Sequence, residues 1–92
     1  MPIARKLGIP FDRYVIGAPL IGPQDGNNKL FSTPDKYLPE TLSVFYNGVC
    51  MKEGEDYWWR ESGGAGTGYD QIEFIIRAPL PDDVLQVNYV KA

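Results

Sequence analysis

The side chains that most often carry out catalysis are nearly absent from this chain of 92 residues, which has no histidine and one cysteine. Nucleophile–base pairs and zinc sites draw on those residues, so the sequence offers neither. Two acidic pairs remain, Glu55-Asp56 and Asp82-Asp83, but both lie in predicted turns, where a solvated charge is the expected role. We therefore expect no enzyme activity and no cofactor.

Two further segments have the composition of ligand-binding loops without the required spacing. Residues 25–28 offer oxygen atoms to a calcium ion, but a calcium loop spreads its ligands over about twelve residues and closes with a glutamate. Residues 63–68 are rich in glycine, but no Gly-Lys-Ser/Thr follows, and Tyr69 stands where a dinucleotide-binding loop needs glycine. The first segment is predicted to be a turn and the second a flexible loop between two strands.

The adjacent residues Trp58 and Trp59 are the other candidates for binding. Neighbouring residues in a strand point to opposite faces of the sheet, so only one indole can enter the core. The other indole is covered by a neighbouring subunit, by a loop of the same domain, or by a ligand that stacks on it. Tryptophan is enriched among the residues that dominate protein interfaces, which favours the subunit.

The elements around these residues read as strands. Large side chains alternate at Leu42, Val44 and Tyr46, and the following Asn47-Gly48 supplies the two positive φ angles of a tight hairpin turn. The same period returns in two later segments: Ile72, Phe74 and Ile76, then Leu85, Val87 and Tyr89. Strands with one apolar face must bury it against another layer. We therefore predict an all-β fold, a small antiparallel β-sandwich or barrel-like domain over residues 24–92.

The predicted strands also suggest structural roles for Pro34 and Cys50. Pro34 is expected to end the short strand that begins at Leu30, with residues 34–40 as a loop. Cys50 follows the hairpin turn in a strand-like run and is expected to be a small apolar filler, the alternative being a reactive or intermolecular thiol.

The first 23 residues differ from the rest, because glycine and proline interrupt nearly every apolar group before it reaches strand length. We predict an extended N-terminal arm over residues 1–23 that binds a neighbouring subunit, since so apolar a segment is poorly suited to water. The alternative is an edge strand that covers the edge of its own domain. The predicted subunit-interface residues are Ile3, Leu7, Ile9, Phe11, Tyr14, Ile16, Trp58 and Trp59.

Charge is distributed unevenly, although the net charge is only −3. Residues 1–13 carry three basic and one acidic group, a balance of +2, and residues 14–92 carry six basic and eleven acidic groups, a balance of −5. A basic arm can meet the acidic body of another copy, so we expect a homo-oligomer. The acidic balance gives no reason to expect nucleic acid, and no apolar run approaches the roughly 20 residues of a membrane span. We expect a soluble protein made in a cytoplasm.

Several turn and strand motifs follow one another along residues 25–90. They are Asp25-Gly26-Asn27-Asn28 with Phe31, Thr33 and Pro34; Leu42, Val44, Tyr46 and Asn47-Gly48; Gly54-Glu55-Asp56-Tyr57; and Phe74, Ala78-Pro79, Asp83, Leu85, Val87 and Tyr89. In this order they resemble a small β module of tailed-bacteriophage virion proteins over about residues 25–90. Two features depart from that module: Pro81-Asp82-Asp83 replaces its usual Gly-Asp, and residues 58–68 form a longer segment.

The resemblance implies a structural or attachment role in a virion, since such modules occur in tail fibres, baseplate and neck components and capsid surface proteins. We expect a capsid decoration or cement protein, or a head–tail joining component, whose partners are other virion proteins. The alternative is a tail-fibre or host-attachment module in which Trp58 or Trp59, Tyr57 and Tyr69 stack on a surface glycan. A passive spacer domain, a stable monomer without a partner, is the third possibility.

Overall fold

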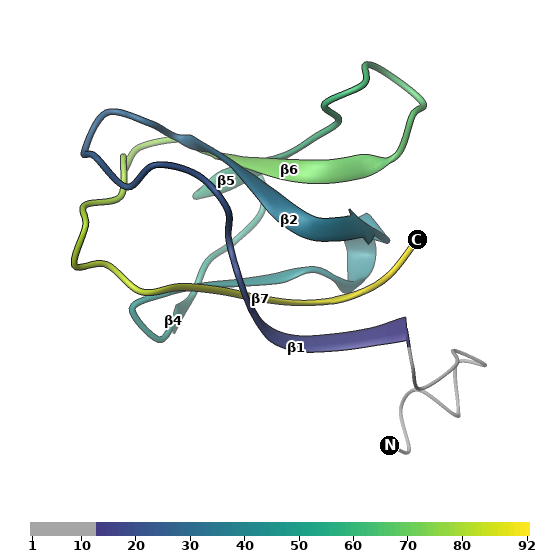
Figure 1. The fold of residues 1–92 in the computed structure, drawn as a ribbon, viewed down its shortest axis with the longest axis horizontal. Helices are drawn as coiled ribbons and strands as arrows, with labels where there is room; N and C mark the ends of the chain where they lie inside the picture. Colours follow the sequence, from purple (N-terminus) through teal and green to yellow (C-terminus); the bar gives the residue numbers. More distant parts are fainter. Residues whose placement is uncertain (1–12) are drawn as a thin grey trace.

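A computed structural model describes residues 13–92, which form two antiparallel β-sheets that pack face to face (Figure 1). The strands are β1 (Tyr14–Pro19), β2 (Leu30–Tyr37), β3 (Ser43–Tyr46), β4 (Val49–Cys50), β5 (Tyr57–Arg60), β6 (Tyr69–Phe74) and β7 (Leu85–Val90), and the 3-10 turn η2 (Pro39–Thr41) precedes β3. The first sheet has the order β1-β7-β3-β4, and the second has the order β2-β6-β5. The predicted all-β sandwich is confirmed. Within residues 13–92, no helix is long and apolar enough to cross a membrane.

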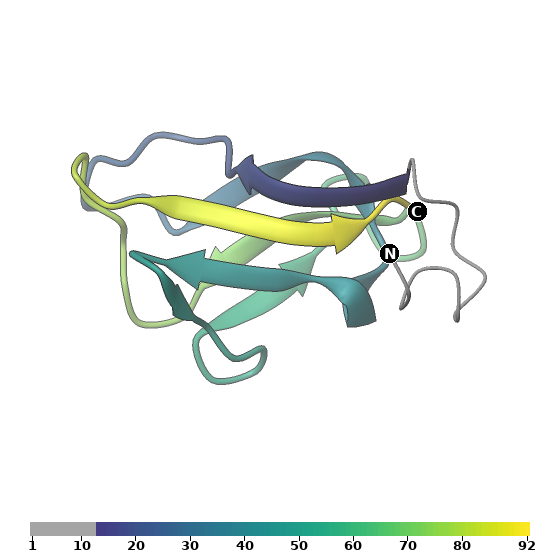
Figure 2. The same cartoon turned by 90° about the horizontal axis from the view of Figure 1, so that it is seen from below.

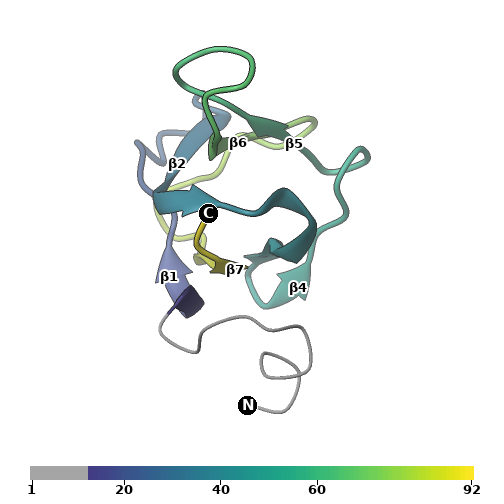
Figure 3. The same cartoon turned by 90° about the vertical axis from the view of Figure 1, so that its right-hand side faces the viewer.

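The core lies between the two sheets, as the view along the strands shows (Figure 3). Alternate side chains of β3, β6 and β7 enter it, as the period of two predicts: Leu42, Val44, Tyr46, Ile72, Phe74, Leu85, Val87 and Tyr89 are all buried. The ring of Phe74 links the two layers, because it meets Phe31 of β2 edge-on at 5.8 Å and Tyr46 of β3 at 5.6 Å.

The hairpin turn between β3 and β4 has the predicted conformation. Asn47 has φ 51° and Gly48 has φ 82°, and the strands pair Tyr46 with Val49 across the turn. Asn47 also binds the segment before β7, since its N–H donates to Val84 O at 2.8 Å and its side-chain oxygen accepts from Val84 N at 2.7 Å. The turn is therefore fixed by tertiary contacts as well as by its own sequence.

Three sequence-based predictions were wrong. Ile76 is 76% exposed, because β6 ends at Phe74 and the chain turns away from the core after it. Cys50 is exposed, because β4 is a two-residue strand at the edge of its sheet. Pro34 does not end its strand: β2 runs on to Tyr37, and because it is an edge strand with an irregular register between Ser32 and Tyr37, it tolerates the missing N–H.

The structure describes the first 23 residues only from residue 13 onward. Residues 14–23 form part of their own domain as an edge strand, which was the alternative to an arm that binds a neighbour. β1 pairs with β7 at the edge of the first sheet, Leu20 is buried, and Ile21 bridges to Ser32 of β2. The chain enters this edge where Lys91 N donates to Arg13 O at 2.9 Å. Ile3, Leu7, Ile9 and Phe11 lie outside the described residues.

Candidate interaction site

The two tryptophans of β5 point to opposite faces of the second sheet, as predicted. Tyr57 is buried, and Trp59 packs against the core with its ring 5.9 Å from that of Tyr69. Trp58 points outward and is 39% exposed. The Nε1 atom of Trp59 is buried, so the polar edge of this indole is closed to a partner.

The exposed Trp58 stands beside a charged pair. The guanidinium of Arg60 lies 6.0 Å from the Trp58 ring centre, and its Nε atom is 2.9 Å from Glu73 Oε1 on β6. Both charged side chains are close to half exposed, so their attraction is screened by water and contributes little to stability. The arrangement holds Arg60 near the indole and leaves the ring available to a partner.

The structure does not bring all the predicted interface residues together. Tyr14 and the exposed Ile16 lie on β1, the outer strand of the first sheet. Trp58 and Trp59 lie on β5, the outer strand of the second sheet. Figure 3 shows these strands at opposite edges of the sandwich. A single partner surface that contacts both pairs would have to reach around the domain.

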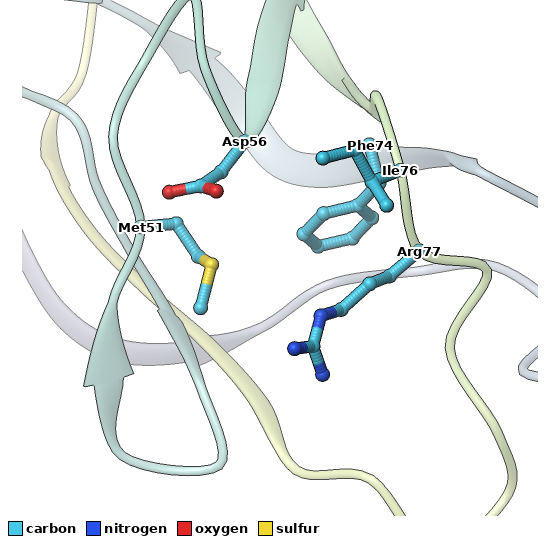
Figure 4. Close-up of a pocket in the computed structure, with 5 residues that line it drawn as sticks. All are labelled: Met51, Asp56, Phe74, Ile76 and Arg77. Atoms are coloured by element: carbon cyan, nitrogen blue, oxygen red, sulfur yellow. The ribbon is translucent and has the colours of Figure 1, made fainter.

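A pocket that the sequence analysis missed opens at one end of the sandwich, where β6 ends. Its volume is about 160 Å³, and it is lined by Met51, Asp56, Phe74, Ile76 and Arg77. Figure 4 shows Met51 and Asp56 on one side of the space and Phe74, Ile76 and Arg77 on the other. Three of the lining side chains are apolar, and the other two, Asp56 and Arg77, carry opposite charges at the rim.

Hydrogen bonds and one cation–π contact hold the two walls of this pocket. Ile75 N donates to Asp56 O at 3.0 Å, which ties the loop between β4 and β5 to the end of β6. The Asp56 carboxylate accepts from Lys52 N at 2.8 Å and so closes its own loop. On the opposite wall, the guanidinium of Arg77 lies over the Tyr46 ring at 5.6 Å from its centre.

Asp83 organises the loops at the same end of the molecule. Its carboxylate accepts hydrogen bonds from the Tyr46 hydroxyl, from Asn47 Nδ2 at 3.0 Å and from Leu80 N at 2.9 Å. These bonds, with that from Tyr46 contributing most, lower the pKa of Asp83 below its usual value. Four large apolar side chains remain exposed around this end: Val49, Ile76, Leu80 and Val84.

This pocket is small, and its lining combines apolar and charged groups. The pocket is smaller than the roughly 300 Å³ at which small-molecule sites begin. Within residues 13–92, no three His, Cys, Asp or Glu side chains lie together as potential metal ligands. The Gly54-Glu55-Asp56-Tyr57 turn, which forms one wall of the pocket, was recognisable in the sequence. No sequence pattern indicates that Ile76 and Arg77 form the opposite wall.

Comparison of the chain with protein-family models, with curated proteins and with solved structures found no match.

Proposed function

We propose that this protein is a non-enzymatic structural component of a tailed-bacteriophage virion, which decorates the capsid or joins head and tail parts by binding neighbouring virion subunits. The observation that carries the proposal is the order of the motifs over residues 25–90, which resembles the small β module of such virion proteins. A structural role calls for a stable small scaffold with surfaces for partners.

Residues of the motifs over residues 25–90 form turns and hydrogen bonds that hold the backbone of the domain. Asp25 Oδ1 accepts hydrogen bonds from Asn27 N and Asn28 N, both at 2.9 Å, and closes the first turn. Gly54 has φ 85° in the turn before β5. Gly26 N donates to Pro79 O at 3.0 Å and joins the first motif to the last. The motifs thus act together as one scaffold, which supports their interpretation as parts of one module.

Two features of the molecule offer contacts to other subunits. Residues 1–12 combine the apolar Ile3, Leu7, Ile9 and Phe11 with basic groups, whereas residues 14–92 have a balance of −5. The described body also exposes Trp58 and the apolar side chains around the pocket. On a repeated lattice, weak contacts of this kind add through avidity.

Mass spectrometry of gradient-purified phage particles tests the proposal, using lysates of the strain that carries this gene. We expect the chain in the particle fraction at many copies per virion and immunogold label at a fixed site on the head, neck or tail. A chain that stays in the soluble fraction while the particles are complete would contradict the proposal.

The exposed Trp58 favours a second candidate function, a host-attachment module that binds a surface glycan. Of the four aromatic residues considered for stacking, Tyr57 is buried and Trp59 and Tyr69 pack against the core, so Trp58 is the one free to stack. Titration of tryptophan fluorescence with bacterial surface polysaccharide should then give a saturable change that Trp58→Ala abolishes. A flat response up to millimolar sugar would exclude this function.

A further inference from the structure

The start of β1 and the pocket lie at diagonally opposite corners of the domain. At the start of β1, which we call the arm root, Tyr14 pairs with Val90, and the pocket lies at the other end of β7, where Leu85 pairs with Tyr46. In the first sheet β1 is the outer strand on one side, and β4, which leads into Met51, is the outer strand on the other. Figure 2 shows the arm root and the C terminus together at one end of the strands.

The span from Arg13 to Leu7 is slightly shorter than the distance from Arg13 to the pocket of the same chain. Leu7 precedes Arg13 by six residues, which span at most about 20 Å when fully extended. The length of β7 alone takes up about 17 to 20 Å, and crossing the first sheet from β1 to β4 adds about 14 Å sideways. These two displacements are perpendicular, so together they separate the pocket from Arg13 by about 22 to 24 Å, slightly more than the Leu7 backbone spans. Ile3, with a maximum span of about 34 Å from Arg13, covers this distance, so chain length favours a second copy for Leu7 alone.

A second copy placed end to end removes this difficulty, because its pocket end then stands next to the arm root. The pocket volume of about 160 Å³ is close to that of the roughly 150 Å³ engineered cavity that holds a benzene molecule, so it suits one apolar side chain. The arm supplies such side chains at Ile3, Leu7 and Ile9.

The charges of the pocket wall and of residues 1–11 also favour contact between these two segments. The loop that forms one wall of the pocket, residues 52–56, carries Glu53, Glu55 and Asp56 against Lys52, which pairs with Glu55 at 3.3 Å. Glu53 and Asp56 leave two negative charges on this wall, and Arg77 on the opposite wall offsets one of them, so a surplus of one negative charge remains at the rim. In residues 1–11 the only charged side chains are Arg5 and Lys6, which flank the apolar Leu7. An apolar side chain next to basic groups is complementary to this rim.

We infer that residues 3–9 of one copy dock in the Met51–Phe74–Ile76 pocket of the next copy, with Leu7 entering the pocket and Arg5 and Lys6 facing Glu53 and Asp56. This inference rests on the proposed subunit-binding role and specifies its partner, a second copy of this chain. The contact joins two different surfaces, so it is heterologous and generates a ring if the rotation closes and a filament if it does not.

Light scattering coupled to size exclusion, over a range of concentrations, tests the docking on the full chain. We expect a concentration-dependent oligomer. Ile76→Lys places a charge at the pocket mouth on a side chain that is already exposed, and should weaken association at least tenfold. Leu30→Lys, a comparable change at an exposed site on the outer face of the second sheet, should leave association within about twofold. Thermal unfolding of both variants checks that they fold.

Reversal of charge tests the pairing itself. Arg5→Glu with Lys6→Glu should weaken association, as should Glu53→Lys, and the three changes combined in one chain should restore at least part of it. A monomer at every concentration, equal behaviour of Ile76→Lys and Leu30→Lys, or no rescue by the combined reversal would each overturn the inference. The virion proposal fails separately, through absence of the chain from purified particles.

Discussion

The hydroxyl of Tyr89 on β7 donates a hydrogen bond to Asp35 Oδ2 on β2 at 2.9 Å and so joins the two sheets at the end where the chain terminates. Tyr89 is buried, and its burial, followed by the neighbouring Asp35, raises the pKa of the Tyr89 hydroxyl to about 12. The hydroxyl is therefore protonated at neutral pH and acts as the donor to a carboxylate.

Replacement of this donor should destabilise the domain. Tyr89→Phe keeps the ring and removes the bond to a charged acceptor, so we expect the free energy of unfolding to fall by about 1 to 2 kcal/mol. The melting temperature should fall by several degrees, since about 1 kcal/mol corresponds to roughly 4 to 8 °C at this size. Calorimetry measures both quantities.

Tyr69→Phe is the matched control for that substitution. Within residues 13–92 the Tyr69 hydroxyl makes no hydrogen bond, and its ring stays packed against Tyr37 and Trp59 in the variant. We expect a change within about 0.5 kcal/mol. Equal losses in the two variants would show that the Tyr89 bond is not the cause.

Two isoleucines four residues apart should respond very differently to truncation. Ile72 is fully buried in β6, and Ile76 is 76% exposed beyond its end. Ile72→Ala should cost about 2 to 5 kcal/mol, because it leaves a cavity, and Ile76→Ala should change stability by less than about 0.5 kcal/mol. Urea unfolding followed by circular dichroism measures both, and similar costs would contradict the position at which β6 ends.

Acid should weaken the loops around Asp83. The pKa of Asp83 is lowered in the folded protein, first by the Tyr46 hydroxyl bond and then by those from Leu80 and Asn47, so folding favours the ionised form. The stability this gives is therefore present above the ordinary pKa of 3.8 and is lost as the pH falls from about 5 through the lowered value.

Asp83→Asn removes the titrating group and should make the midpoint of unfolding less dependent on pH in this range. The variant should also be less stable than the natural chain at pH 7. Urea midpoints measured from pH 7 to pH 2 give the comparison. An unchanged slope in the variant would mean that other carboxylates, such as Asp70, whose pKa is lowered chiefly by the Ser62 hydroxyl, control the acid response.

The hairpin turn gives a prediction about the backbone alone. A Cβ at Gly48 would meet no atom within 4 Å, so Gly48→Ala introduces no clash, but its φ of 82° disfavours an L side chain. We expect a loss of about 1 to 2 kcal/mol with an unchanged dependence on denaturant. A loss near zero would show that the turn adopts another conformation.

The features that the sequence predicted correctly are local. The Asn47-Gly48 turn follows from two residues that tolerate positive φ, and the inward faces of β3 and β7 follow from alternation along the strand. The opposite orientations of Trp58 and Trp59 follow from the same alternation, which does not fix which of the two faces outward. None of these features requires knowledge of which strands become neighbours.

The end and the edge of each strand were decided by partners distant in the sequence. β6 stops at Phe74 where Ile75 N bonds to Asp56 O, which exposes Ile76 and builds the pocket wall. Likewise, β1 is a strand because β7 pairs with it, and Cys50 is exposed because no strand within residues 13–92 pairs with the outer side of β4. Local preferences set the conformation of each segment, whereas long-range hydrogen bonds and burial determine where it ends and which side chains meet, because those energies exist only once the sheets have assembled.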